Sequence, residues 1–166
     1  MRILGIDPGT DRTGYGMIEV SGQSLTCLDY GCIMTEKGIS LPEKLLCIYR
    51  RATDVVARWS PEIMAVEQVF FSRNAKTAFQ VGQARGVVLL VAATFGMELD
   101  ELSPVEVKSS VVGYGNASKE QVKAMTRMIL GLDRMPEPDH AADALACAIA
   151  SSVKRTFKAH LEGVEG

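Results

Sequence analysis

The sequence has no excess of positive charge and no long hydrophobic segment, and both absences narrow the classes of protein that it can encode. The formal net charge is −2 at pH 7, whereas nucleic-acid-binding proteins are usually basic. Any contact with a nucleic acid would therefore depend on a local cluster of basic residues. The longest apolar stretch, from Gly86 to Met97, is shorter than the roughly 20 residues that a membrane-spanning helix requires.

Targeting segments, disulfide frameworks and repeats are missing as well. Asp7 interrupts the N-terminal apolar run before the hydrophobic region of a signal peptide could form, so we expect a cytoplasmic protein. The four cysteines show neither a C-x-x-C pair nor zinc-ribbon spacing, which favours buried thiols in a reducing compartment. Without repeats or linkers, the chain is predicted to form one domain, 1–166, with a core over about 1–157 and a flexible C-terminal tail.

The pattern of apolar residues and turn residues predicts a mixed α/β fold. We expect strands over residues 3–7, 15–20, 25–35, 63–67 and 98–102. Short connections between the first three strands predict antiparallel neighbours. The later strands alternate with helical patterns, which predicts β-α-β units. The sequence therefore favours a mixed sheet with flanking helices.

Capping signals mark where several helices begin. The pattern Ser-x-x-Glu or Ser-x-x-Gln starts at Ser40, Ser103 and Ser118 and is typical of a helix N-terminus. Gly131 is expected to end one helix. Asp139, after a proline, is expected to be the N-cap of an alanine-rich last helix.

Acidic residues stand where two apolar strands end. Asp7 follows Ile3–Ile6, and Glu67 follows Ile63–Val66. If these strands are parallel neighbours, both carboxylates meet at the edge of the sheet where ligands bind in open α/β folds. Taken singly, Asp7 could instead be a turn former, and Glu67 could face solvent.

The last predicted helix adds a further candidate pair. His140 and Asp143 are three residues apart and so lie on one helix face, although each could also be an ordinary surface residue. Carboxylates that converge in this way need a compensating cation. Oxygen ligands favour Mg²⁺ or Mn²⁺, and two such ions about 4 Å apart are the usual arrangement for phosphodiester hydrolysis.

Five segments, in order and in register, resemble the signature blocks of one nuclease family. They are Leu4–Thr10 (LGIDPGT), Ala65–Phe70 (AVEQVF), Gly82–Gly86 (GQARG), Val107–Gly113 (VKSSVVG) and His140–Ala146 (HAADALA). Together they resemble the RuvC family of bacterial Holliday junction resolvases, which are RNase H-like nucleases. The resemblance extends from Arg2 to about Ser152.

The resemblance implies an RNase H-like domain with a five-stranded mixed sheet and helices on both of its faces. It implies a homodimer that binds a four-way DNA junction, nicks two opposed strands symmetrically during recombination and repair, and works with the RuvA–RuvB branch-migration complex. Carried over by position, the metal ligands are Asp7, Glu67, His140 and Asp143, which would bind two Mg²⁺ ions, with Mn²⁺ as a substitute. Many relatives have Asp where this chain has His140, so Asp139 is kept as an alternative fourth ligand.

Several aromatic and basic residues are candidates for DNA contact. Phe70 would stack on an unpaired base near the cut, although Phe70 and Phe71 could equally be one core residue and one loop residue. Seven residues make up this predicted DNA-binding set: Phe70, Arg73, Lys76, Arg85, Lys108, Lys119 and Lys123. The resemblance places Lys108 and Lys119 nearest the metals, whereas other members of the set could belong to an ordinary solvated surface.

Two further expectations concern assembly and rival functions. Symmetric cleavage requires two sites related by a two-fold axis, and the helix predicted over 74–95 is the candidate interface, unless its apolar face is simply core. The first rival function is an actin-like or sugar-kinase-like ATPase, suggested by Asp7–Thr10, but 166 residues are too few for its two domains. The second rival is a non-catalytic junction-binding paralogue, against which the intact acidic set argues.

Overall fold

The structure is a computed structural model that describes residues 1–68 and 75–164, without the side chains of 75–77 and 160–164. Its strands are β1 (Arg2–Asp7), β2 (Arg12–Ser21), β3 (Ser24–Met34), β4 (Ile63–Glu67) and β5 (Glu98–Leu102). Its helices are α1 (Leu41–Trp59), α2 (Ala75–Thr94), α3 (Pro104–Val112), α4 (Lys119–Ile129) and α5 (Asp139–Val164). No helix in these residues is long and apolar enough to span a membrane.

The strands form one mixed sheet in the order β3-β2-β1-β4-β5. β1 and β3 both pair with β2 in antiparallel fashion, as predicted from the short connections between them. β4 lies parallel to β1, and β5 lies parallel to β4. The predicted five-stranded mixed sheet with three antiparallel leading strands is therefore confirmed.

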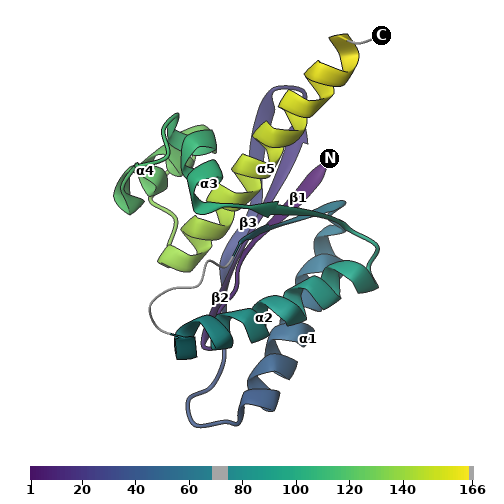
Figure 1. The fold of residues 1–166 in the computed structure, drawn as a ribbon, viewed down its shortest axis with the longest axis vertical. Coiled ribbons are helices and arrows are strands. Elements are labelled where there is room, and N and C mark those ends of the chain that lie inside the picture. Colours follow the sequence, from purple (N-terminus) through teal and green to yellow (C-terminus); the bar gives the residue numbers. More distant parts are fainter. Residues whose placement is uncertain (69–74, 165–166) are drawn as a thin grey trace.

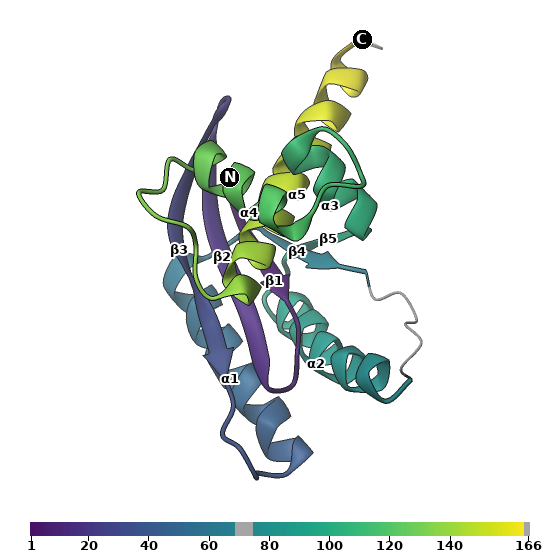
Figure 2. The same cartoon turned by 90° about the vertical axis from the view of Figure 1, so that its left-hand side faces the viewer.

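Helices cover both faces of the sheet, as predicted (Figures 1 and 2). On β1, Ile3 belongs to the core beneath α3, α4 and α5, while Leu4 belongs to the core beneath α1 and α2. Successive side chains of a strand point to opposite faces, so a strand buried on both faces is apolar at almost every position. This explains why β1 and β4 are continuous apolar runs that end in an acid.

The helix ends agree with the capping signals except at α5. The side chains of Ser103 and Ser118 accept hydrogen bonds from backbone N–H groups of their first turns. Gly131 follows α4 with a φ of 60°, a left-handed conformation that ends a helix without strain in glycine. The prediction that Asp139 caps α5 is wrong. The Ala142 N–H donates to the carbonyl of Pro138, so Pro138 holds the cap position and Asp139 is the first helical residue.

Candidate active site

Asp7 and Glu67 end adjacent parallel strands and point to the same face of the sheet. The register pairs Ile6 with Val66, so the two acids occupy the next matching position. Asp7 is four residues from Ile3 and Glu67 is four residues from Ile63, and both isoleucines lie in the core beneath α5. Because side chains alternate along a strand, both carboxyl groups face α5.

Glycines in the sheet allow α5 to lie against the strands. A Cβ atom added at Gly5 would come within 1.9 Å of the Ala144 carbonyl oxygen, and one added at Gly14 would come within 1.9 Å of the His140 carbonyl oxygen. Neither position tolerates a side chain without displacement of the helix backbone. Gly5 faces the small residue Ala144, and Gly14 faces the backbone carbonyl of His140. This close contact brings the first turn of α5 next to Asp7.

The first turn of α5 places His140 directly on Asp7. The distance from His140 Nδ1 to Asp7 Oδ2 is 2.6 Å, so the two side chains share a hydrogen bond. One turn further along α5, Asp143 Oδ2 lies 2.8 Å from the Nζ atom of Lys119, which begins α4. The Asp7 side chain is 22% exposed and that of Asp143 is 32% exposed, so both remain within reach of solvent and of a ligand.

Burial and mutual repulsion disfavour the charged forms of the two strand acids. Burial raises the pKa of Asp7, the hydrogen bond and charge of His140 oppose this change, and the Asp143 carboxylate adds to it. Burial also raises the pKa of Glu67, and the charges of Asp7 and Asp143 raise it further. Such destabilised carboxylates would gain from a bound cation.

A hollow of about 260 Å³ opens beside these acids. Glu67 and Asp143 line it together with Lys108 and Lys119, and the Cys147 side chain lies one turn beyond Asp143 at its wall. The charges of both lysines lower the pKa of Glu67, so both ammonium groups are close enough to act on that carboxylate. The hollow thus combines anionic groups that suit a cation with cationic groups that suit a phosphate.

The chemistry of these groups fits divalent cations, but their present arrangement is not a complete metal-binding site. Three carboxylates and one imidazole form the oxygen-rich donor set expected for Mg²⁺ or Mn²⁺. Within residues 1–68 and 75–164, however, no three His, Cys, Asp or Glu side chains are arranged to hold an ion as they stand. Two of these acids already have polar partners, since His140 lies beside Asp7 and Lys119 pairs with Asp143.

The predicted DNA-binding residues fall into four groups, of which Arg85 forms the last. Phe70 and Arg73 lie outside the described residues, and so does the side chain of Lys76. Lys108 and Lys119 lie in the hollow beside the acids. Lys123 bonds to Glu137 and Asp139, at 2.6 and 2.8 Å.

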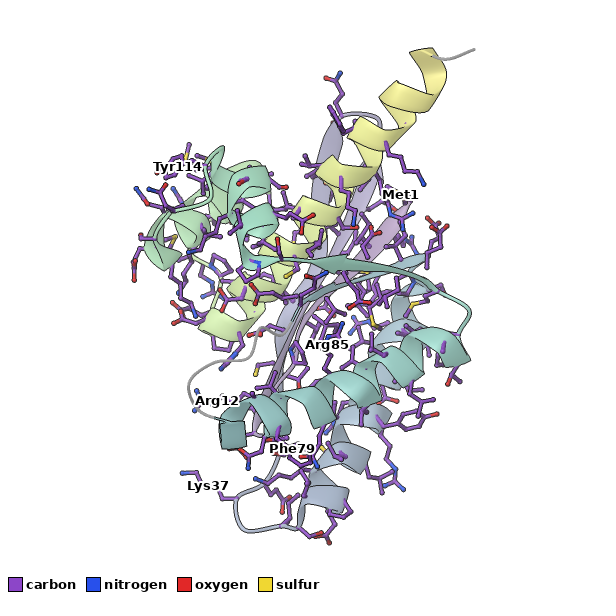
Figure 3. The ribbon with its side chains drawn as sticks, viewed as in Figure 1. Met1, Arg12, Lys37, Phe79, Arg85 and Tyr114 are labelled. Carbon is purple, nitrogen blue, oxygen red and sulfur yellow. The ribbon has the colours of Figure 1, made fainter. Side chains whose placement is uncertain are left out.

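Arg85 has a different environment from the lysines of the hollow. Its guanidinium pairs with Glu101 of β5, and its side chain is 19% exposed. Figure 3 shows Arg85 on the side of α2 that faces the sheet, with Phe79 on the other side of the helix. This ion pair ties α2 to β5, so a contact of Arg85 with DNA stays a prediction that would require the pair to open.

Sequence reasoning missed two features of the site. One is the role of Gly5 and Gly14, whose lack of a side chain allows α5 to pack closely against the strands. The signal in the sequence was glycine at alternate positions of a strand, together with an alanine-rich helix. The other is the contact between Lys119 and Asp143. Lys119 was expected only as a phosphate contact, and no spacing in the sequence indicates that it pairs with a predicted metal ligand.

Sequence comparison finds one family over nearly the whole chain. The sequence model of the family described as crossover junction endodeoxyribonuclease RuvC matches residues 3–151. A protein of that name from Desulfitobacterium hafniense is 50% identical over 149 residues, which are 90% of each chain. Another from Heliobacterium modesticaldum is 48% identical over 157 residues, which are 95% of this chain and 97% of that protein.

Structural comparison leads to the same group of proteins. Thermus thermophilus RuvC in complex with a Holliday junction substrate matches with a TM-score of 0.91 and 36% identity, over 95% of this chain and 96% of that chain. The yeast mitochondrial Holliday junction resolvase Ydc2 matches with a TM-score of 0.65 and 13% identity, over 96% of this chain and 83% of that chain. At that identity the second likeness shows the fold alone.

Proposed function

The chain belongs to the RuvC family of crossover junction endodeoxyribonucleases, and from this we propose that it resolves Holliday junctions by nicking two opposed strands. The junction as substrate is carried over from the Thermus thermophilus relative, which was solved with a Holliday junction. The observation that carries the proposal is the convergence of Asp7, Glu67 and Asp143 at one edge of the sheet. Family membership and this convergence together support hydrolysis.

The proposed metal ligands are Asp7, Glu67, His140 and Asp143. Two divalent cations bound by these groups would activate water and stabilise the leaving 3′ oxygen. Asp139 is the less suitable fourth ligand, because its carboxylate is engaged by Lys123, whereas His140 contacts Asp7 directly. The imidazole favours borderline metals, so we expect Mn²⁺ to support activity relatively well.

Lys108 and Lys119, which line the hollow, provide local positive charge in a chain whose net charge is negative. Lys108 acts on Glu67 through its charge, and Lys119 lies 2.8 Å from Asp143. Both are placed to contact a phosphate bound over the acids, where an ammonium group stabilises the charge that develops on the phosphate oxygens. A local patch of this kind is what the net charge of −2 requires for DNA binding.

Symmetric cleavage requires a second copy of the site, which a two-fold dimer would supply. The solvent-facing side of α2 supports this part of the proposal. Phe79 is 69% exposed and Leu90 is 57% exposed, and eleven residues of helix return to nearly the same face. Cooperation with the RuvA–RuvB complex in the bacterial cytoplasm is the corresponding proposal for partners.

A synthetic four-way junction tests the proposed function. We expect the protein with Mg²⁺ or Mn²⁺ to nick opposed strands of the junction while leaving a linear duplex of the same sequence intact. Asp7→Asn should abolish cleavage and leave junction binding largely unchanged, because it removes a metal ligand and no basic contact. Cleavage by this variant at the normal rate would show that Asp7 is not a ligand, and equal cutting of the duplex would contradict the junction as substrate.

A further inference from the structure

Lys119 lies between two carboxylates of the first turns of α5. Its Nζ atom is 2.8 Å from Asp143 Oδ2 and 4.0 Å from Asp139 Oδ2. The Lys119 side chain is 51% exposed, so its flexible stem is free to pivot. A small movement of the ammonium group is enough to exchange one carboxylate for the other.

Asp139 is held in place to receive that ammonium group. Its Oδ1 atom lies 2.8 Å from Lys123 Nζ, which also lies 2.6 Å from a carboxylate oxygen of Glu137. The Lys123 side chain is only 14% exposed, so this anchor is far less mobile than Lys119. The two oxygens of Asp139 thus have different neighbours, with Oδ1 bound to Lys123 and Oδ2 directed toward Lys119.

We infer that Asp139 is a positioning residue that takes over Lys119 when Asp143 binds a divalent cation. A cation bound by Asp143 competes with Lys119 for the negative charge of that carboxylate, and it repels the lysine ammonium group. Without a second acceptor, the lysine would move into solvent and away from the phosphate. With Asp139 fixed one turn earlier on α5, the lysine stays at the rim of the carboxylate cluster.

The charges around the pair are consistent with this exchange. The hydrogen bond to Asp143 raises the pKa of Lys119, and Asp139 contributes to the same effect. The hydrogen bond from Lys123 lowers the pKa of Asp139, with the charge of Lys119 adding to it.

A double-mutant cycle on metal affinity tests this inference, which rests on the proposed metal site. Titration calorimetry with Mg²⁺ alone would compare the wild type with Asp139→Asn, Lys119→Met and the double variant. We expect Asp139→Asn to weaken Mg²⁺ binding about threefold to tenfold, since the ion must then expel Lys119 without a second acceptor. In the Lys119→Met background the same change should have less than about a twofold effect, because no lysine needs to be received.

Two matched variants separate positioning from general charge. Glu137→Gln removes a neighbouring carboxylate that contacts Lys123 but not Lys119, so it should change Mg²⁺ affinity less than about twofold. Asp139→Glu keeps the acceptor and should restore affinity. NMR of protein labelled at lysine with ¹³C and ¹⁵N reports on the Lys119 side chain. Added Mg²⁺ should change the Lys119 chemical shifts in the wild type, and the shifts reached should differ from those reached in Asp139→Asn.

The possible failures are distinguishable. Equal weakening by Asp139→Asn in both backgrounds would show that Asp139 acts on the ion directly and would overturn the positioning role. If Asp7→Asn and Asp143→Asn abolish Mg²⁺ binding but Asp139→Asn does not change it, the positioning role of Asp139 is overturned. The proposed function would then still stand. If all of these acid variants still bind Mg²⁺ as the wild type does, the proposed function itself is overturned.

Discussion

At the scale of single residues, burial opposes the charged form of the Asp7 carboxyl group. Its raised pKa, caused first by burial, means that the folded protein binds a proton at Asp7 more readily than the unfolded chain. The folded state is therefore penalised above the raised pKa, and the penalty fades as pH falls toward the ordinary value of 3.8. The carboxylate that the proposed metal site needs therefore lowers the stability of the folded, metal-free protein.

Asp7→Asn is accordingly expected to stabilise the metal-free protein while it abolishes cleavage. The free energy of unfolding should rise by about 1 kcal/mol at neutral pH. The difference from the wild type should shrink as pH falls through the raised pKa of Asp7, because the wild-type carboxyl group is then neutral as well. Denaturant unfolding in the presence of a chelator, at several pH values, measures this difference. A variant less stable than the wild type at every pH would contradict the account.

His140 is the one member of the proposed ligand set that is not a carboxylate. We expect His140→Asp to lower the ratio of the Mn²⁺-supported to the Mg²⁺-supported cleavage rate by about fivefold or more, since a carboxylate suits Mg²⁺ better than an imidazole does. Single-turnover cleavage of one junction in each metal gives the ratio. His140→Ala is the control, because it removes the imidazole without adding an oxygen ligand. An unchanged ratio in His140→Asp would show that His140 does not contact the ions.

Sequence patterns predicted that the candidate acids converge, but they did not predict the local partners of these acids. Asp7 and Glu67 were recognisable because each ends a buried apolar strand. Asp139 was misjudged as a cap, although residues four apart on a helix lie about 40° apart around its axis. Asp139 and Asp143 can therefore both reach Lys119, and only the docking of α4 on α5 reveals this contact.

At the scale of elements, the close approach of α5 to the sheet sets the geometry of the site. Strand positions and the mixed topology were predictable, because alternation, apolar runs and short turns are local signals. The approach distance was not, because it depends on which glycines of β1 and β2 face the helix. Those faces are defined by the packing of α5 on the strands, which brings Gly5 and Gly14 against residues more than 120 positions away in the chain.

Gly14→Ala tests this dependence. An added methyl group would meet the backbone of His140, so α5 must move, with an expected loss of about 2–3 kcal/mol in the free energy of unfolding. Cleavage should fall more than junction binding does. Gly31→Ala on β3 is the matched control, since the three atoms nearest to its methyl group would all belong to the Tyr15 side chain and not to a backbone, and it should cost less than about 1 kcal/mol. Equal losses in the two variants would point to a general strand effect.

At the scale of the whole molecule, one side of α2 is an exposed apolar surface. Phe79 and Leu90 lie on it with the exposed glycines Gly82 and Gly86 between them. A monomer rarely exposes such a surface without a partner. The prediction that α2 forms a dimer interface therefore has physical support.

Leu90→Lys should convert the predicted dimer into a monomer. Two like charges would face each other across a two-fold axis, each desolvated by the contact. Sedimentation equilibrium would report the mass, with Val153→Lys on exposed α5 as the control. The monomer should nick a junction on one strand at a time, whereas the wild type cuts opposed strands together. A wild type that sediments as a monomer at micromolar concentration would count against the interface.

The order of the site residues along the chain has a consequence for synthesis of the protein. Asp7 comes from the first strand, Glu67 from the fourth, and His140 and Asp143 from the last helix. A polypeptide emerging from the ribosome therefore exposes its first acid long before the partners of that acid exist. Premature termination anywhere before α5 would leave fragments that lack part of the proposed ligand set, so the proposed capacity to break DNA would arise only after the first turns of α5 have been synthesised.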